Sequence, residues 1–231
     1  MRRDQVLLEG ETPSRITIFG ATGRTGKPLV EQALAAGYEV TAFVRDPAKV
    51  TTKHERLTVV QGDATDAVAV ERAVRGADAV ISVMNTPGSQ KIAKSKPLTR
   101  GTQNIVDAMK KYGVRRLIIS SAGIPQPNDL PNIRFKLMMG FGKLIMRASY
   151  DDIVGSVEVV RASDTDWTVV RMVPTNDPPT GRVNAGYMNK RVGTISRADA
   201  AAFMLNEVCE AKYLRQAPVI WSCVNGRSLK I

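Results

Sequence analysis

The segment 16–30, ITIFGATGRTGKPLV, places three glycines between two apolar runs. Gly20, Gly23 and Gly26 follow a G-x-x-G-x-x-G spacing. After a buried strand, the first glycine allows a tight turn, the second lets the backbone approach a pyrophosphate, and the third permits close packing of helix on strand. The phosphate then lies on free N–H groups at the positive end of the helix dipole. The segment therefore predicts a strand, a turn that binds a dinucleotide phosphate, and a helix.

Strand-like and helix-like patterns alternate along the rest of the chain, which is typical of a parallel sheet with helices on both faces. We therefore expect an α/β fold: a single Rossmann-like, doubly wound domain with a mostly parallel sheet. The expected strands are 15–19, 39–45, 57–63, 78–84, 115–123, 166–172 and 217–223. The expected helices are 26–37, 66–77, 96–113 and 196–210.

The NAD(P)-binding domain is expected to cover 15–231, after a short N-terminal extension over 1–14. One segment, 124–152, interrupts the alternation directly after the fifth expected strand. It opens with three prolines and continues as a basic stretch rich in methionine. We expect a lid-like helical insertion at the carboxyl edge of the sheet, which is the edge where open α/β sheets bind ligands.

The end of the second expected strand reads TAFVRDP, with Arg45 at its tip and Asp46 next. Proteins that bind NAD place an acid there to bond the ribose 2′-hydroxyl, whereas an arginine accommodates the 2′-phosphate of NADP. The planar guanidinium of Arg45 matches phosphate geometry. Arg24, inside the glycine turn, would face the same phosphate. The sequence therefore predicts NADP(H) as the cofactor, unless Asp46 points inward and repels the phosphate.

Five motifs in this order, GATGRTG, FVRDP, GDATD, ISSAG and DWTVVR, resemble the atypical short-chain dehydrogenase/reductase superfamily. Within it, the chain is similar to the single-domain NAD(P)H-binding proteins that include NmrA-like proteins and biliverdin-IX-beta reductase/flavin reductase. The resemblance runs over 15–223. It implies a Rossmann-like, mostly parallel fold, in agreement with the strand and helix patterns.

The resemblance also implies a set of cofactor-binding residues at the ends of the expected strands. The set is Gly20, Ala21, Thr22, Gly23, Arg24, Thr25, Gly26, Arg45, Asp63, Ala64, Met84, Asn85, Thr86, Ser120, Ser121, Val173 and Pro174. By position, the glycine loop 20–26 wraps the pyrophosphate and Arg45 holds the 2′-phosphate. Asp63 and Ala64 border the adenine.

The remaining positions of this set surround the other end of the cofactor. The resemblance implies that residues 84–86 line the cofactor after the fourth strand. Ser120 and Ser121 lie beside the nicotinamide, and Val173 and Pro174 close over its amide.

Two positions depart from the pattern of the family. Flavin-reductase-type relatives often have glycine where this chain has Asn85, whose side chain would narrow the site or bond the ribose. The histidine that lines the substrate pocket in biliverdin-reducing relatives has no counterpart, and Pro174 lies near that position. The resemblance therefore gives little support for biliverdin as the substrate.

The chain lacks the Tyr-x-x-x-Lys dyad with which many members of the superfamily protonate a carbonyl. None of its five tyrosines is followed by a lysine four residues later. This disfavours carbonyl or alcohol chemistry of that type and, together with the short chain, a sugar-nucleotide epimerase.

Two functional hypotheses remain. In the first, the protein transfers hydride from NADPH to a conjugated acceptor such as a flavin, a quinone or a tetrapyrrole-like molecule, which needs little protein acid because the cofactor carries the chemistry. Ser121 is then the candidate catalytic residue, which positions the acceptor or relays a proton; a structural serine at a strand end is the alternative. In the second, an NmrA-like redox sensor binds NADP(H) and acts through a protein partner without turnover.

The insertion is dominated by apolar residues over 134–147. Four basic residues punctuate them: Arg134, Lys136, Lys143 and Arg147. Gly140 and Gly142 are expected to weaken a continuous helix. Three interpretations are open: a lid over a flat, apolar, anionic acceptor, a helix packed on the domain with a homodimer contact, or contact with a membrane surface.

The net charge of +11 favours anionic partners, such as a phosphorylated cofactor or an acidic substrate, although a basic solvated surface is an alternative. Four basic residues after the fourth expected strand would form a rim at the same sheet edge: Lys91, Lys94, Lys96 and Arg100. The chain has no arginine-rich tail and no nucleic-acid-binding motif, so we do not expect nucleic acid as a partner.

No window of the sequence is long and apolar enough for a membrane span, and the N-terminus lacks the apolar core of a signal peptide. Cys209 and Cys223 are expected in a helix and a strand, and a disulfide between them is not expected. With His54 as the single histidine, a metal site is not expected either. A reducing cytoplasm is the expected location.

Overall fold

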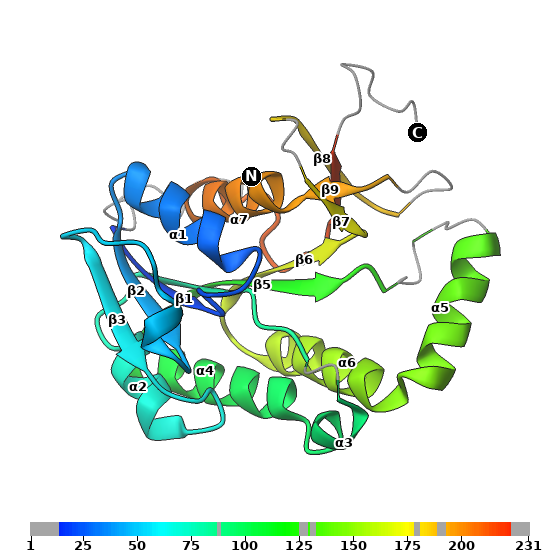
Figure 1. The fold of residues 1–231 in the computed structure, drawn as a ribbon, viewed down its shortest axis with the longest axis horizontal. Coiled ribbons are helices and arrows are strands. Elements are labelled where there is room, and N and C mark those ends of the chain that lie inside the picture. Colours follow the sequence, from blue (N-terminus) through cyan, green and yellow to red (C-terminus); the bar gives the residue numbers. More distant parts are fainter. Residues whose placement is uncertain are drawn as a thin grey trace, which may run out of the picture.

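The computed structural model describes residues 14–86, 89–124, 129, 133–177, 181–188 and 193–222. An eight-stranded sheet lies between two layers of helices (Figure 1). Its strands are β1 (Arg15–Phe19), β2 (Glu39–Val44), β3 (Leu57–Gln61), β4 (Ala79–Ser82), β5 (Arg116–Ala122), β6 (Asp166–Met172), β8 (Val183–Gly186) and β10 (Val219–Ser222). A separate two-stranded sheet is formed by β7 (Thr175–Asn176) and β9 (Ile195–Ser196). The helices are α1 (Gly26–Ala35), α2 (Ala67–Val74), α3 (Gln90–Ala93), α4 (Pro97–Tyr112), α5 (Ile133–Ile145), α6 (Arg147–Ala162), α7 (Arg197–Glu210) and the 3-10 turn η1 (Pro47–Lys49).

The main sheet has the strand order β3-β2-β1-β4-β5-β6-β10-β8. Its neighbouring strands are parallel, except for β10 and β8, which are antiparallel. The succession of strands reverses direction between β1 and β4, and such a switch point is where open α/β sheets bind ligands. The expected fold class, a Rossmann-like and mostly parallel sheet, is confirmed.

Strand β1 shows why its sequence, RITIF, is apolar at most positions. Ile18 packs in a cluster with α1 and α7, whereas Phe19 packs with α2 and α4 on the opposite face of the sheet. Both side chains are fully buried. Burial of a side chain of this size contributes about 1.5–3 kcal/mol. The polar Thr17 is accommodated because its hydroxyl donates to the Ala73 carbonyl at 2.7 Å.

The helix boundaries follow local signals that the sequence contains. Ser196 precedes α7, and its hydroxyl accepts the N–H of Asp199 at 3.2 Å, as the capping pattern predicts. Helix α4 ends at Tyr112, and Gly113 directly after it has a φ of +71°. Glycine adopts this left-handed conformation without the steric cost that a side chain would add.

The sequence did not predict β7, β8, β9, α3 or the part of α6 beyond residue 152. Strand β8 has the sequence VNAG and only one β-branched side chain. It exists because it pairs antiparallel with β10, with Ile220 opposite Ala185. A strand this short carries little pattern of its own, so its partner determines it. Cys223 of the expected last strand and residues 1–13 of the expected extension lie outside the described residues.

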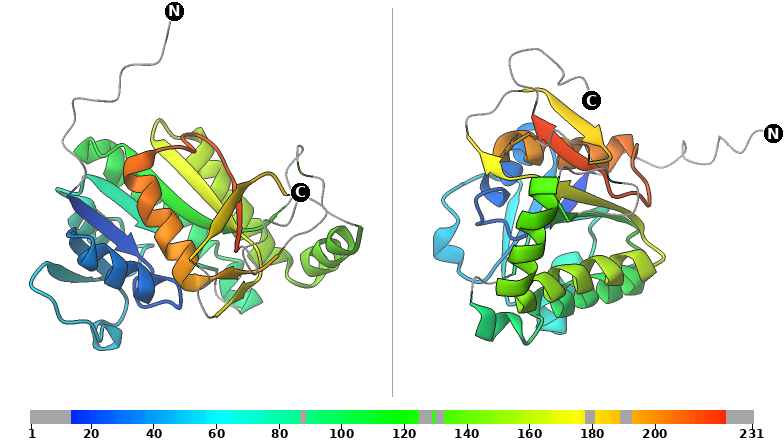
Figure 2. Two further views of the ribbon diagram at one scale, coloured as in Figure 1. Left: turned by 90° about the horizontal axis from the view of Figure 1, so that it is seen from above. Right: turned by 90° about the vertical axis from the view of Figure 1, so that its right-hand side faces the viewer.

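The connection from β5 to β6 contains two helices that behave differently. Helix α6 begins at Arg147, inside the segment expected as an insertion, and it packs along α4 to cover one face of the sheet. Helix α5 stands away from the sheet (Figures 1 and 2). It runs unbroken through Gly140 and Gly142. Each glycine costs about 1 kcal/mol in a helix relative to alanine, so the weakening expected from them stays a prediction.

Candidate functional site

The turn between β1 and α1 has a backbone that requires its glycines. Gly20 has a φ of +80°, and a Cβ there would lie 2.9 Å from the carbonyl carbon of Val83, directly after β4. A Cβ on Gly26 would lie 2.1 Å from the Gly20 oxygen. The turn is closed by the N–H of Gly23, which donates to that oxygen at 2.9 Å. A tight turn with close backbone packing is the geometry that the dinucleotide fingerprint needs.

The beginning of α1 suits an anion. Thr25 precedes the helix, its side chain makes no capping hydrogen bond, and the first turn carries no acidic residue. Gly23 and Arg24 are exposed, while Ala21 is buried beneath the turn and Thr22 is half-buried. The positive end of the helix dipole therefore faces an accessible loop with a basic side chain. These features fit the pyrophosphate of a dinucleotide.

At the end of β2, Arg45 and Asp46 make different contacts. The Asp46 carboxylate accepts the N–H of Ala48 at 3.1 Å and lies 3.6 Å from Lys49, so it caps η1. Arg45 is exposed, and its carbonyl accepts a hydrogen bond from Gln61 at 3.4 Å. The negative charge of Asp46 is thus engaged within its own turn, while the guanidinium of Arg45 is accessible.

Asp63 follows β3 and is held by its own turn. The hydroxyl and the N–H of Thr65 donate to Asp63 Oδ1 at 2.6 and 2.8 Å. These hydrogen bonds lower the pKa of Asp63, and the charges of Arg45 and Arg100 lower it further against the effect of burial. The end of β3 therefore keeps a carboxylate in the vicinity of two arginines.

Ala64 and Met84 follow different strands and meet against α4. The Ala64 carbonyl accepts a hydrogen bond from Asn104 at 2.8 Å. A Cβ on Gly101 would lie 2.9 Å from the Ala64 Cβ and 3.5 Å from the Met84 Cε. The glycine in α4 therefore lets the residues that follow β3 and β4 pack closely against this helix.

Asn85 is exposed, and its side chain folds back on the chain. Its Oδ1 accepts the N–H of Thr86 at 2.9 Å. The hydroxyl of Thr86 donates to Asp152 Oδ2 on α6 at 3.3 Å. The loop after β4 is therefore fixed both by a local turn and by a long-range hydrogen bond.

Asp152 is an organising residue that sequence reasoning missed. It is fully buried on α6 and accepts the N–H groups of Leu98 and Thr99 at 3.1 and 2.8 Å. Lys96 precedes α4 in a left-handed conformation and provides no side-chain cap, so Asp152 caps α4 instead. No local motif signals this role, because the cap and the helix are far apart in the sequence.

The ends of β5 and β6 place the residues expected near the nicotinamide. Ser120 is half-buried and Ser121 is buried, and Ser121 lies opposite Arg171 in the register of the two strands. Beyond β6, Val173 is buried and Pro174 is exposed, and the Pro174 carbonyl accepts a hydrogen bond from β9 at 3.2 Å. These residues share the carboxyl edge with the glycine turn.

Arg171 forms a buried ion pair that the sequence analysis did not find. Its guanidinium binds Asp129, and it also donates to the carbonyls of Ala217 and Ile124 at 2.6 and 3.1 Å. Asp129 in turn accepts the N–H of Met188 at 2.7 Å. The pair ties the segment after β5 to β6 and to the loop after β8. The available signal was a single arginine inside the apolar strand DWTVVRM.

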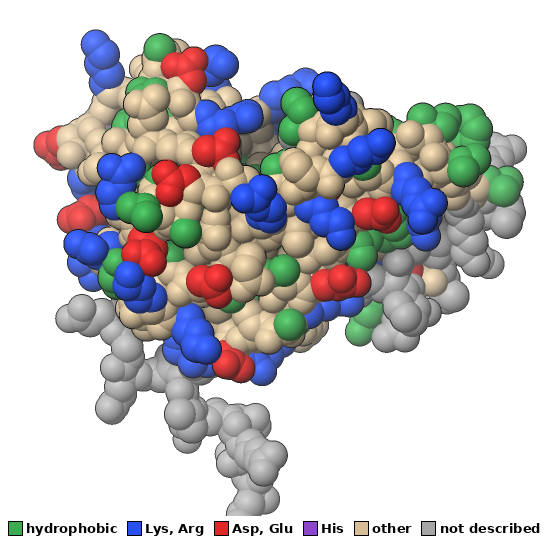
Figure 3. Space-filling view, turned by 90° about the horizontal axis from the view of Figure 1, so that it is seen from below, with side chains coloured by type: hydrophobic (Ala, Val, Ile, Leu, Met, Phe, Trp, Pro, Cys, Tyr) green, Lys and Arg blue, Asp and Glu red, His purple; other side chains and the backbone are tan. Residues whose placement is uncertain are grey.

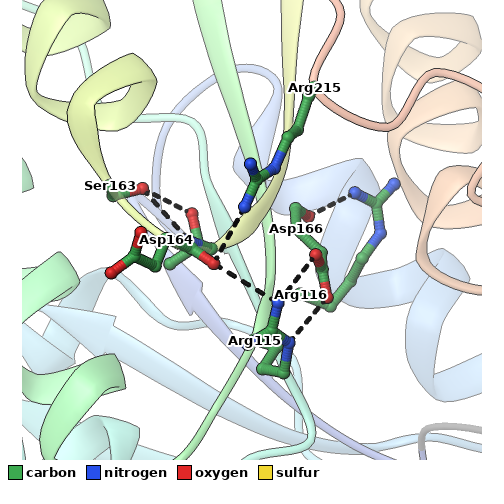
Figure 4. Close-up of polar contacts among 7 residues, drawn as sticks. Arg115, Arg116, Ser163, Asp164, Asp166 and Arg215 are labelled. Atoms are coloured by element: carbon green, nitrogen blue, oxygen red, sulfur yellow. Dashed lines mark hydrogen bonds and ion pairs between the residues drawn. The ribbon is translucent and has the colours of Figure 1, made fainter.

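Two hollows lie at the opposite, amino edge of the sheet. One, of about 580 Å³, lies between the C-terminal parts of α4 and α6, and the other, of about 420 Å³, lies beneath β1 and β2. None of the expected cofactor residues lines either hollow. Beside the first, Arg115 binds Asp166 at 2.9 Å, and Arg115 and Arg215 both donate to the Asp164 carbonyl (Figure 4). This network fixes the turn before β6.

The fold and the glycine turn together define a dinucleotide-binding protein of the Rossmann type. A family model described as NAD(P)H-binding matches residues 20–210. The chain belongs to this NAD(P)H-binding family, and the expected family resemblance and cofactor class are confirmed.

Curated relatives include reductases. A 3-diazoavenalumate denitrifying reductase of a Streptomyces species is 29% identical over 190 residues, which cover 77% of this chain and 62% of the relative. An uncharacterised chloroplastic protein of Arabidopsis thaliana is 30% identical over 179 residues, covering 73% of this chain and 62% of the relative. The chain therefore spans less than two thirds of the length of these relatives.

Solved structures share the fold over nearly the whole chain. A short-chain dehydrogenase/reductase of the wide type from Veillonella parvula, in complex with NADP, has a TM-score of 0.73 at 19% identity and covers 90% of this chain and 94% of its own. ChuY, an anaerobillin reductase from Escherichia coli O157:H7, has a TM-score of 0.72 at 21% identity, with 90% and 97% covered. Within the described residues, no helix has the length and hydropathy to cross a membrane.

Proposed function

We propose that the protein is an NADPH-dependent reductase that transfers hydride to a flat, conjugated acceptor such as a flavin, a quinone or a tetrapyrrole-like molecule. The observation that carries the cofactor preference is at the end of β2. Asp46 caps η1, and Arg45 is left accessible at the position that faces the ribose 2′-group in this fold. A guanidinium favours the 2′-phosphate of NADPH over the hydroxyl of NADH.

The cofactor-binding residues are proposed by their places at the carboxyl edge. The glycine loop 20–26 holds the pyrophosphate at the start of α1, and Arg45 with Arg24 holds the 2′-phosphate. Asp63 and Ala64 border the adenine. The tight backbone of the glycine turn supports this assignment, because a Cβ at Gly26 would fill the space that the turn occupies.

The other half of the edge is proposed to hold the nicotinamide and the acceptor. Residues 84–86 line the cofactor beyond β4, Ser120 and Ser121 border the nicotinamide, and Val173 with Pro174 covers its amide. The bound cofactor supplies the hydride. The protein orients the two reactants, and the Ser121 hydroxyl positions the acceptor or relays a proton to it.

A conjugated acceptor agrees with the side chains of this edge. Such a molecule spreads the charge that it receives over many atoms, so it does not require a strong protein acid. The chain lacks the Tyr-x-x-x-Lys dyad. The names of two related proteins, a denitrifying reductase and an anaerobillin reductase, support reduction of a small molecule.

The test is NADPH oxidation followed by nicotinamide absorbance, with FMN, riboflavin, quinones and biliverdin as acceptors and NADH in parallel. We expect saturable turnover with a preference for NADPH. Arg45→Ala should weaken NADPH binding by about tenfold to a hundredfold, the value of one or two charge-assisted hydrogen bonds, and should leave NADH binding nearly unchanged. Arg72→Ala, an exposed arginine on α2, is the matched control.

Equal losses for both cofactors would contradict the role of Arg45. Tight binding of NADPH without turnover of any acceptor would favour the alternative function, an NADP(H)-binding redox sensor that acts through a protein partner. Binding titrations and turnover assays on the same preparation separate these outcomes.

A further inference from the structure

Helix α5 presents large apolar side chains to solvent. Leu137, Phe141 and Leu144 follow an i, i+4, i+7 spacing and therefore lie on one face, with Ile145 beside them. Their exposed fractions are 67%, 66%, 77% and 59%. Single exposed apolar residues are common on protein surfaces, but a contiguous group marks an interaction site.

The charged side chains near the C-terminal end of α5 are mostly basic. The sequence has no Asp or Glu from 130 to 150. Lys143 lies over the ring of Tyr150 at 5.0 Å, and the side chain of Arg147 is 83% exposed. The Asp151 carboxylate lies 3.8 Å from Arg147. The apolar face of α5 is thus accompanied by cations at its C-terminal end.

Helix α3 lies against the start of α6, the helix that directly follows α5. The side-chain amide of Gln90 donates to Ser149 at 2.7 Å and accepts the N–H of Ala148 at 3.1 Å, which fixes α3 against the start of α6. Three residues at α3 are exposed: Lys91, Ile92 and Lys94. Figure 3 shows a group of hydrophobic side chains at one end of the molecule with Lys and Arg side chains next to it.

We propose that α5 and α3 form a contact surface for an anionic lipid bilayer, on which the protein lies without spanning it. The apolar face of α5 would enter the boundary between headgroups and acyl chains, and the basic side chains would meet lipid phosphates. Charge complementarity selects this occupant: a second copy would bring two basic surfaces together on a chain of net charge +11. This proposal is independent of the acceptor and of catalysis.

The first experiment is co-sedimentation of the full chain with phosphatidylcholine vesicles and with vesicles that also contain phosphatidylglycerol. We expect binding to the anionic vesicles that decreases as salt is added, because salt screens the basic side chains. Binding to neither kind of vesicle, or equal binding to both, would overturn the proposal.

The apolar contribution is tested with the double variant Phe141→Ser and Leu144→Ser. Both side chains are mostly exposed, so the fold should be retained, while vesicle binding should fall by at least about tenfold because two insertions into the lipid boundary are lost. Val68→Ser is the matched control, since Val68 is 69% exposed on α2. A similar decrease of vesicle binding in the double variant and in Val68→Ser would overturn the assignment of the lipid contact to α5.

The basic contribution is tested with Lys143→Glu. Each cation near an anionic surface contributes about 1 kcal/mol, so the reversal should weaken binding by about fivefold or more. Lys212→Glu is a close control because Lys212 also lies over a tyrosine ring, that of Tyr213, at 5.6 Å. Size-exclusion chromatography tests the other candidate occupant, a second copy of this chain. A dimer that the Phe141→Ser and Leu144→Ser variant dissociates would overturn the proposal, because α5 would then bind a second copy instead of lipid.

Discussion

The two halves of the sheet reach the same edge by different means. At the ends of β1, β2 and β3, short segments set their own geometry: Gly20 turns the chain, Asp46 caps η1, and Thr65 donates hydrogen bonds to Asp63. In the β5–β10 half, distant segments must meet, as Arg171 and Asp129 do. The half proposed to bind a common cofactor is therefore encoded locally, whereas the half proposed to face the acceptor depends on long-range contacts.

The largest effect is expected in the half built by long-range contacts. Asp129→Ala leaves the buried guanidinium of Arg171 without its carboxylate, and breaking a buried pair in this way costs about 3–5 kcal/mol. The free energy of unfolding in urea measures this loss. Asp177→Ala is the control, because its pair with Arg197 has an exposed carboxylate and should contribute less than about 1 kcal/mol. Similar losses of unfolding free energy in Asp129→Ala and Asp177→Ala would contradict the special importance of the buried pair.

A smaller effect is expected in the locally encoded half. Gly26→Ala places a methyl group 2.1 Å from the Gly20 oxygen, and such overpacking should lower the free energy of unfolding by about 1–3 kcal/mol. NADPH binding, followed by fluorescence titration, should weaken in the same variant. Gly140→Ala in α5 meets no atom within 4 Å and should instead stabilise the helix by up to about 1 kcal/mol. If Gly26→Ala left the free energy of unfolding and NADPH binding unchanged, the turn would not need its glycine.

The smallest effect concerns a single titration at the end of β3. Thr65→Val removes the hydroxyl that donates to Asp63, so the pKa of Asp63 should rise toward its usual value. A lowered folded-state pKa stabilises the protein above the unfolded-state pKa, and this stabilisation is lost as the pH falls through the folded-state pKa. The variant should therefore be less stable than the natural protein near neutral pH, and the difference should disappear in acid. NMR titration of the Asp63 carboxyl group checks the shift, and an unchanged pKa would contradict it.

The sequence was sufficient for the sheet core and for the glycine turn. Apolar runs bounded by glycine and polar turns gave the strands β1 to β6 and the helices α1, α2, α4 and α7, because these patterns repeat within each element. The close approach of Gly20 to the end of β4 follows from the parallel order of the strands. The roles of Arg45 and Ser121 in binding and catalysis stay predictions that the experiments above test.

Several features were decided by contacts between distant residues. Strand β8 forms because β10 offers a partner, and α4 is capped by Asp152 from α6. Helix α5 is continuous through Gly140 and Gly142, and the weakening expected from these glycines is tested by Gly140→Ala. The apolar side chains of Leu137, Phe141 and Leu144 on this helix are exposed, which the composition could not show.

The sequence by itself determined the parallel α/β core, the dinucleotide turn and the basic character of the molecule, because periodicity, glycine spacing and charge are local or additive properties. Only the tertiary structure decided which distant groups the buried carboxylates meet: Asp129 pairs with Arg171, and Asp152 accepts the N–H groups of Leu98 and Thr99 at the start of α4. Buried charges require partners, and the chain supplies those partners from wherever the fold brings them into reach.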